Sequence, residues 1–144
     1  MTTFLLDANV LIAILSKKHD HRDRARSWFE SEGHHDWITC PTTQNAVVRI
    51  MSGSGFSLDR VTPGAMIESL ESLITIGNHR YVPDDASILD QSLINRTRLL
   101  ASKQVTDTYL LALAVRNDAL LATFDRRLVH DAIRDGQQHL YLIQ

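Results

Sequence analysis

The stretch Leu5-Leu6-Asp7-Ala8-Asn9-Val10-Leu11-Ile12 lies near the amino terminus and joins two apolar runs through a polar centre. The first run predicts a buried strand over residues 3–6, and the second predicts a helix over residues 10–15. Asp7 or Asn9 is able to accept hydrogen bonds from the free amides at the start of that helix. A strand that leads directly into a helix is typical of an α/β fold.

The same alternation of strand and helix continues along the chain. Further strands are expected over residues 37–40, 81–82, 120–124 and 139–143. Further helices are expected over residues 22–30, 41–51, 66–74, 88–100, 107–117 and 126–134, with a Gly/Ser loop over residues 52–56 and Thr106 as an N-cap. Short strands between helices predict a central parallel sheet. No repeat or linker divides the chain, so a single domain over residues 1–144 is expected.

The composition is that of a globular protein with one domain. A chain of 144 residues removes roughly 70 per cent of its unfolded-chain surface from water. Its longest apolar run, residues 109–115, is far shorter than the roughly 20 residues of a membrane span. Because the amino terminus does not resemble a secretion signal and Cys40 is the one cysteine, we expect the protein in the cytoplasm. The net charge of −2 neither favours nor excludes nucleic acid as a partner.

Three aspartates, Asp7, Asp107 and Asp125, stand where a predicted strand ends or a predicted helix begins. Each one alone is explained by helix capping, because an acid at a helix start accepts hydrogen bonds from free amides. Together they point to one edge of a parallel sheet, where ligands bind beyond the strand ends. Converging carboxylates need a cation, and oxygen-only ligands suit magnesium or manganese. Asn9 and Thr123 lie two residues from Asp7 and Asp125, and such neighbours orient a carboxylate or a metal-bound water.

Three motifs give this pattern a family resemblance. They are residues 5–12, Val105-Thr106-Asp107-Thr108-Tyr109-Leu110-Leu111-Ala112-Leu113-Ala114, and Leu121-Ala122-Thr123-Phe124-Asp125-Arg126. In order and spacing they resemble the motifs of PIN-domain ribonucleases, most closely the toxins of VapBC-type toxin–antitoxin pairs. The resemblance implies a three-layer α/β domain that hydrolyses RNA with Mg²⁺ or Mn²⁺, with Asp7, Asp107 and Asp125 as metal-binding and catalytic acids. It also implies a cognate antitoxin and a homodimer.

The chain departs from that family at its second motif, Pro41-Thr42-Thr43-Gln44-Asn45-Ala46-Val47-Val48-Arg49-Ile50. Gln44 occupies the position where the resemblance leads us to expect a glutamate. A neutral amide leaves three acids in place of four, so weaker metal binding is expected, with Gln44 orienting a metal-bound water or the scissile phosphate. A magnesium ion that keeps most of its waters needs only one or two carboxylates, so the loss of one acid is compatible with an active site.

Other interpretations remain open at this stage. One is a PIN domain without catalysis that works by binding RNA or a partner, which Gln44 motivates. Another is an aspartyl phosphotransfer protein, although such phosphatases need Asp-x-Asp and here the second position is Asn9. The pairs His19-x-His21 and His34-His35 lack cysteine partners and do not support zinc. For RNA contacts the candidates are Arg49, Arg126 and Arg127, and with less support Lys17, Lys18, Arg22, Arg24 and Arg26.

Overall fold

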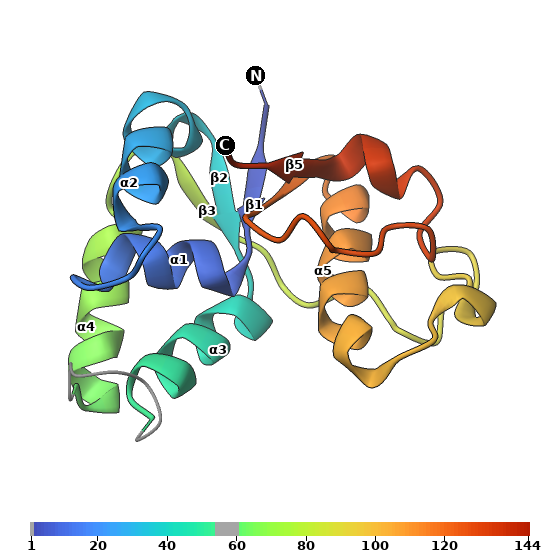
Figure 1. Ribbon diagram of the computed structural model, residues 1–144, viewed down its shortest axis with the longest axis horizontal. Helices are drawn as coiled ribbons and strands as arrows, with labels where there is room; N and C mark the ends of the chain where they lie inside the picture. Colours follow the sequence, from blue (N-terminus) through green and yellow to red (C-terminus); the bar gives the residue numbers. More distant parts are fainter. Residues whose placement is uncertain (1, 54–60) are drawn as a thin grey trace.

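A five-stranded parallel sheet forms the centre of the computed structural model, which describes residues 2–53 and 61–144 (Figure 1). The strand order is β3-β2-β1-β4-β5, and all neighbouring strands run parallel. The strands are β1 (Phe4–Leu6), β2 (Trp37–Thr39), β3 (His79–Tyr81), β4 (Leu120–Thr123) and β5 (Leu140–Leu142). The predicted α/β class, the central parallel sheet and all five expected strands are confirmed, with ends that differ by at most two residues.

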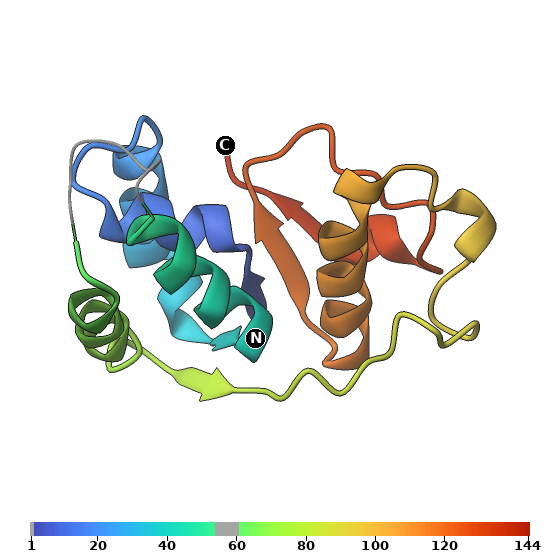
Figure 2. The same cartoon turned by 90° about the horizontal axis from the view of Figure 1, so that it is seen from below.

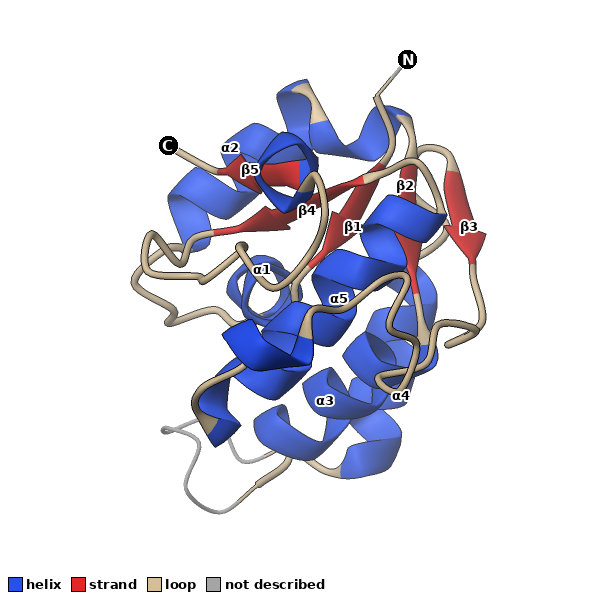
Figure 3. Ribbon diagram, turned by 90° about the vertical axis from the view of Figure 1, so that its right-hand side faces the viewer, coloured by secondary structure: helices blue, strands red, loops and turns tan. Residues whose placement is uncertain are grey.

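Helices cover both faces of the sheet and make a three-layer domain (Figures 1 and 3). Side chains of four helices pack with one face: α1 (Ala8–Leu15), α2 (Arg22–Ser31), α3 (Pro41–Met51) and α4 (Pro63–Leu73). The helix α5 (Val105–Arg116) packs on the other face. The side chains of β1 alternate between the two faces of the sheet. Phe4 and Leu6 belong to the core on the side of α1–α4, and Leu5 belongs to the core on the side of α5. A strand covered on both faces must be apolar throughout, which explains the uninterrupted run before Asp7.

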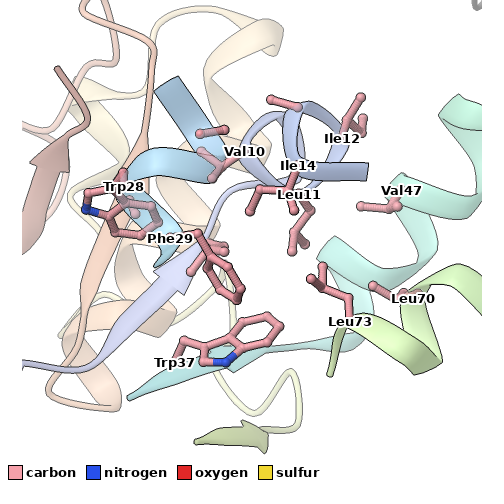
Figure 4. Packing of buried hydrophobic residues seen from close by; sticks show 14 of the residues in the cluster. Val10, Leu11, Ile12, Ile14, Trp28, Phe29, Trp37, Val47, Leu70 and Leu73 are labelled. Carbon is pink, nitrogen blue, oxygen red and sulfur yellow. The ribbon is translucent and has the colours of Figure 1, made fainter. Parts of the chain in front are cut away.

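Aromatic side chains fill the core on the α1 side (Figure 4). Phe29 meets Trp37 edge to face with ring centres 5.0 Å apart, and Phe4 meets Trp28 in the same way at 5.1 Å. The indole Nε1 of Trp37 donates to the carbonyl of Ile76 at 3.0 Å, so its one polar group is satisfied although the side chain is fully buried. These contacts tie α2 to β1 and β2 and hold the sheet edge beside α1.

Two predicted helices are wrong. Residues 88–100 form turns and the short 3-10 helix η2 (Arg96–Arg98), and Leu89 and Leu100 are 76% and 83% exposed. The physical reason is local: side-chain oxygens of Ser87, Asp90 and Asn95 accept hydrogen bonds from backbone amides two residues later. Such turns compete with the helix for the same amides.

The second wrong prediction concerns residues 126–134, which also form turns. Leu128 and Ile133 are buried as expected of a helix stripe, but Ile133 pairs with Ile94 in an isolated antiparallel bridge. Asp125 Oδ1 accepts a hydrogen bond from the amide of Arg127 at 2.9 Å, so the chain turns where a helix was expected to begin. The other helices are confirmed with shifted ends.

Smaller differences concern the element ends. The α5 helix begins at Val105, with Gln104 and not Thr106 in the capping position. The short 3-10 helix η3 (Ser102–Gln104) precedes it, and η1 (Gly33–His35) and η4 (Gly136–His139) precede β2 and β5. Of the expected Gly/Ser loop, residues 54–56 lie outside the described residues. Among the helices that the structure describes, none is long and apolar enough to cross a membrane.

Candidate active site

The carboxyl ends of β1 and β4 form the point where the order of the sheet reverses. The chain leaves β1 toward β2 and β3 on one side and returns later to place β4 on its other side. Asp7 directly follows β1, and its backbone amide donates to the carbonyl of Ala122 in β4 at 3.0 Å. In Figure 2 these strand ends lie between α1 and α3 on one side and α5 on the other. In open α/β sheets this reversal point is where ligands bind.

Asp7 is the buried member of the site. Its side chain is 6% exposed, and the hydroxyl of Thr123 donates to its Oδ2 at 3.0 Å. Burial raises the pKa of the Asp7 carboxyl, while the hydrogen bonds from Thr123 and from the amides of Ala8 and Asn9 lower it. The charge of Asp125 adds a smaller increase. A carboxylate held in this way is strongly oriented but poorly solvated, which is the condition in which a cation gains most.

Asp125 is fixed by a short relay of hydrogen bonds through the same hydroxyl. Thr123 Oγ1, which donates to Asp7, also accepts a hydrogen bond from the amide of Asp125 at 3.1 Å. The Asp125 side chain in turn accepts from the amide of Arg127 and stays exposed. One buried threonine therefore sets the positions of two acids that come from different strands.

Asp107 completes the group from the other side of the sheet. It is the third residue of α5 and is half-buried. Burial raises its pKa to about 6, and the charges of Asp7 and Asp125 add to that increase. Among the described residues, no hydrogen bond or ion pair reaches the Asp107 carboxyl. The charges of Asp7 and Asp125 therefore act on Asp107, and the binding of one metal by all three aspartates stays a prediction.

The donor set fits a hydrated divalent ion. Asp7, Asp107 and Asp125 offer oxygen ligands only, the type preferred by magnesium and manganese. Within residues 2–53 and 61–144, no three acidic, histidine or cysteine side chains lie close enough to bind one ion together. Magnesium usually takes one or two carboxylates and keeps several waters, so a looser group is compatible with it. Burial is the main cause that raises the pKa of Asp7 and of Asp107, and neighbouring charges add to it; a cation beside these carboxylates would favour their ionised form.

Two hollows meet at Asp125. The first, of about 310 Å³, is called here the α5 hollow and is lined by Lys103, Gln104, Asp107, Asp125, Arg127, Leu128 and Val129. The second, of about 540 Å³, is called the histidine hollow and is lined by Asn9, Ser16, Lys18, His19, Asp20, His21, Phe124 and Asp125. Asp107, Asp125 and Asn9 thus line two adjoining hollows, whereas the buried Asp7 lines neither of them. A polymer passing across Asp125 would contact both hollows.

The side chain of Gln44 makes its hydrogen bond at the end of β2 and not with one of the three aspartates. Its amide Nε2 donates to Thr39 Oγ1 at 3.0 Å, and the same hydroxyl lies 2.8 Å from His79 Nε2. Thr43, Val47 and Met51 form the buried side of α3, so Gln44, one residue after Thr43, points along the adjacent side. There it lines a groove between α3 and α4 of about 620 Å³. The predicted role in orienting a metal-bound water finds no contact in the described structure.

The arginines proposed to contact RNA lie in different parts of the surface. Arg127 lines the α5 hollow, whereas Arg49 lines the groove between α3 and α4. Arg22 and Arg26 donate to the backbone carbonyls of Ser16 and Ile14 and so tie α2 to the end of α1, and their contact with RNA stays a prediction.

Four residues that line the two hollows were not predicted from the sequence as part of the site. They are Lys103, Gln104, Phe124 and His21, of which His21 was considered only as a zinc ligand. Nothing in their local sequence context marks them, because turns of the chain and not helical periodicity bring them to the site. Thr108, directly after Asp107, is fully buried and its hydroxyl has no partner among the described residues.

Comparison with known proteins places this geometry in a family context. The PIN domain family model matches residues 4–133. Ribonuclease VapC44 of Mycobacterium tuberculosis is 38% identical over 137 residues, which cover 94% of this chain and 96% of that protein. Ribonuclease VapC39 of the same organism is 35% identical over 130 residues, covering 90% of this chain and 94% of that protein.

Solved structures share the fold at low sequence identity. VapC20 of Mycobacterium tuberculosis, described as a Sarcin-Ricin loop cleaving toxin, superposes with a TM-score of 0.63 at 9% identity, covering 92% of this chain and 97% of that chain. DNA-bound VapBC from Salmonella typhimurium gives a TM-score of 0.63 at 16% identity, with 100% of both chains covered. These likenesses show a shared three-layer architecture.

Proposed function

The chain belongs to the PIN domain family, and on that premise we propose that it is a divalent-metal-dependent endoribonuclease that serves as the toxin of a toxin–antitoxin pair. The ribonuclease assignment follows from curated VapC ribonucleases that align with nearly its full length. The observation that supports the metal dependence is that burial raises the pKa of Asp7 and Asp107 at the reversal point of the sheet, with the charges of Asp7 and Asp125 adding to the increase at Asp107. Such a group is unfavourable without a cation beside it.

The proposed mechanism assigns each side chain one task. Asp7, Asp107 and Asp125 would hold one or two Mg²⁺ or Mn²⁺ ions, which supply charge neutralisation at a phosphodiester and a more acidic bound water. Thr123 holds Asp7 and Asp125 in register through its two hydrogen bonds. Lys103 and Arg127 line the α5 hollow beside the acids, where they would contact phosphates of the RNA. Asn9, exposed at the start of α1, would bind substrate or ordered water.

Gln44 has no direct task in this mechanism. Its hydrogen bond to Thr39 joins α3 to the end of β2, so it acts on the site only by holding these elements together. The expectation that its neutral amide weakens metal binding stays a prediction. Metal titration tests it, together with the alternative of a PIN domain that binds RNA or a partner without catalysis.

An antitoxin is the proposed cellular partner. VapBC complexes are among the structures that share this fold. An arginine of that partner placed against Asp7 or Asp107 would make a charge-assisted contact and compete with the metal. We further propose a homodimer as the basic unit and a cytoplasmic location, in which the buried free thiol of Cys40 stays reduced. Co-expression with the product of the adjacent gene and light scattering of the purified chain test the two assemblies.

The decisive experiment is cleavage of total RNA by the purified chain with magnesium, with manganese and with chelator. Cleavage with either ion that stops on chelation, and that is absent in Asp107→Asn, supports the proposal. The matched control is Asp131→Asn, which removes an exposed carboxylate that pairs with Arg98 and lines neither hollow. Cleavage that persists in chelator, or in Asp107→Asn, contradicts the metal mechanism. RNA that is bound but never cut under all metal conditions contradicts the enzyme assignment.

A further inference from the structure

Aromatic and polar side chains line the histidine hollow on the side of Asp125 away from α5. His21 and Phe124 lie nearly parallel, with ring centres 4.8 Å apart and planes 22° from each other. The guanidinium of Arg24 lies over the Phe124 ring at 5.0 Å and its Nη1 is 3.1 Å from His21 Nδ1. The ring of His19 follows at 5.6 Å from His21. His21 and Phe124 therefore form a stacked pair beside a carboxylate of the candidate site, and the His19 ring lies next to it at a tilt of 43°.

The loop that carries the two histidines is held in place from several directions. The amide of His21 donates to His19 Nδ1 at 3.0 Å, and Arg22 Nη1 donates to the carbonyl of the buried Ser16 at 3.0 Å. Arg24 Nη2 donates to the carbonyl of Ile143 at 3.0 Å and so ties the loop to the end of the chain after β5. Because these contacts order the rings before any ligand arrives, little entropy remains to be lost on binding.

The chemistry of the hollow matches one class of ligand. Its volume of about 540 Å³ lies within the range of about 300–1,000 Å³ typical of small-molecule sites. Flat rings at its wall suit stacking, while Asn9 and Asp20 supply hydrogen-bonding groups and Lys18 a positive charge. Single-stranded RNA is recognised by bases that stack on histidine, phenylalanine or arginine and are hydrogen-bonded at their edges.

We propose that the histidine hollow binds one unpaired nucleobase of the RNA, next to the phosphodiester that the three carboxylates address. This inference rests on the proposed function, because it assumes an RNA substrate across Asp125. Since Phe124 directly precedes Asp125, a base stacked in the hollow sets the position of the neighbouring phosphate relative to the acids. The hollow then contributes to the choice of cleavage position. A protein segment from a partner is the alternative occupant that the test separates.

The test is a binding cycle with single-stranded RNA in chelating buffer, where the proposed cleavage is stopped. A fluorescent oligoribonucleotide is compared with versions that lack the base at one position at a time, using wild type, His21→Ala and Phe124→Leu. One abasic position should weaken binding to wild type at least about fivefold, as expected for one stacked base. The same abasic position should cause no further loss in His21→Ala or Phe124→Leu. His21→Phe, which keeps a flat ring, should retain the wild-type sensitivity.

Control variants make the outcome specific. His35→Ala changes an exposed histidine in η1, before β2 and therefore at the opposite end of the sheet from Asp125, and should bind like wild type. Thermal melts identify any variant that fails to fold, and His19→Ala then replaces it in the cycle. Equal abasic sensitivity in wild type and His21→Ala overturns the base site, as does the absence of any sensitive position or of any RNA binding by wild type. Competition by antitoxin without any abasic effect assigns the hollow to the protein partner and also overturns it.

Cleavage assays with magnesium keep this inference separate from the proposed function. If cleavage occurs but the cycle shows no coupling, the nuclease assignment stands and the base site fails. If the cycle shows coupling but no metal supports cleavage, the base site stands on a chain that binds RNA without cutting it.

Discussion

The hydroxyl of Thr123 donates a hydrogen bond of 3.0 Å to Oδ2 of Asp7, although 116 positions of sequence separate the two residues. The same oxygen accepts from the amide of Asp125 at 3.1 Å. One side chain at the end of β4 therefore determines how an acid after β1 and an acid after β4 face each other. This arrangement depends on the parallel pairing of β1 with β4, in which Leu6 lies opposite Ala122.

Replacing Thr123 by Val tests that arrangement while keeping the side-chain shape. Asp7 loses a buried donor, so we expect a loss of about 1–3 kcal/mol in the free energy of unfolding and weaker metal binding. Chemical denaturation and calorimetric metal titration measure the two effects. Thr108→Val is the matched control, because the buried Thr108 hydroxyl has no partner among the described residues and its removal should be neutral or stabilising. Equal stability of the two variants would contradict the role of the Thr123 hydrogen bond.

Asp107→Asn should abolish metal-dependent cleavage without lowering the thermal midpoint. The Asp107 carboxyl is disfavoured by burial and by two neighbouring charges, so a neutral amide removes repulsion and leaves the midpoint unchanged or raised. Melting curves and cleavage rates in the same buffer check both parts. A variant that melts well below wild type would show that Asp107 is chiefly a structural residue.

The free energy of unfolding and the metal affinity should both depend on pH through Asp107. Its pKa is about 6 in the folded chain and about 4 in an unfolded chain. The folded state holds the proton of Asp107 more tightly than the unfolded state does, so protonation stabilises the fold. This contribution is complete below about pH 4 and is lost as the pH rises through about 6. Metal affinity should change in the opposite direction and fall as the pH drops below about 6, because the ion needs the ionised carboxylate. Titration of metal affinity against pH measures this. An apparent midpoint near pH 4 would contradict it, and Asp107→Asn should lose the corresponding step in stability.

Gln44→Glu separates the sequence-based expectation from the structure. An added carboxylate near the ion would tighten metal binding by about tenfold or more. With Gln44 directed at Thr39, we expect metal affinity to change by less than about twofold and stability to fall by about 0.5–1.5 kcal/mol, because an ionised glutamate donates no hydrogen bond. Asn45→Asp, at the exposed next position, is the control for added charge. A tenfold gain in affinity would place the side chain beside the acids after all.

Gly77 supports the sheet from the far end of β2 and β3. Its φ angle is +66°, and a Cβ there would meet the carbonyl oxygen of His34 at 2.0 Å. Gly77→Ala should therefore destabilise the fold by about 1–3 kcal/mol, through backbone strain and the clash. Gly64→Ala, in α4 where a Cβ meets no atom within 4 Å, should be neutral or stabilising by up to about 1 kcal/mol. Denaturation curves that rank the two variants in the reverse order would contradict this account.

By itself the sequence determined the fold class, the strand positions and the three acids. These features depend on local pattern: apolar runs such as residues 4–6 must be buried, and an acid directly after such a run must lie at a strand end. Parallel strands bring their carboxyl ends to one edge, so Asp7 and Asp125 meet without further information. The family motifs added the reaction class by resemblance.

Tertiary structure alone decided the direction of Gln44 and the meeting of His21 with Phe124, whereas the turns of residues 88–100 follow from local hydrogen bonds that the apolar pattern does not reveal. The sequence predicted the helix that carries Gln44. The direction of the Gln44 side chain depends on which side of α3 packs against α1, and the periodicity of one helix does not determine this. Residues 88–100 carry an apolar pattern of helical spacing, yet their neighbouring Ser, Asp and Asn side chains bind the backbone amides first. The histidine hollow depends on His21 meeting Phe124 across more than 100 positions, a contact that only the parallel sheet and its connections create.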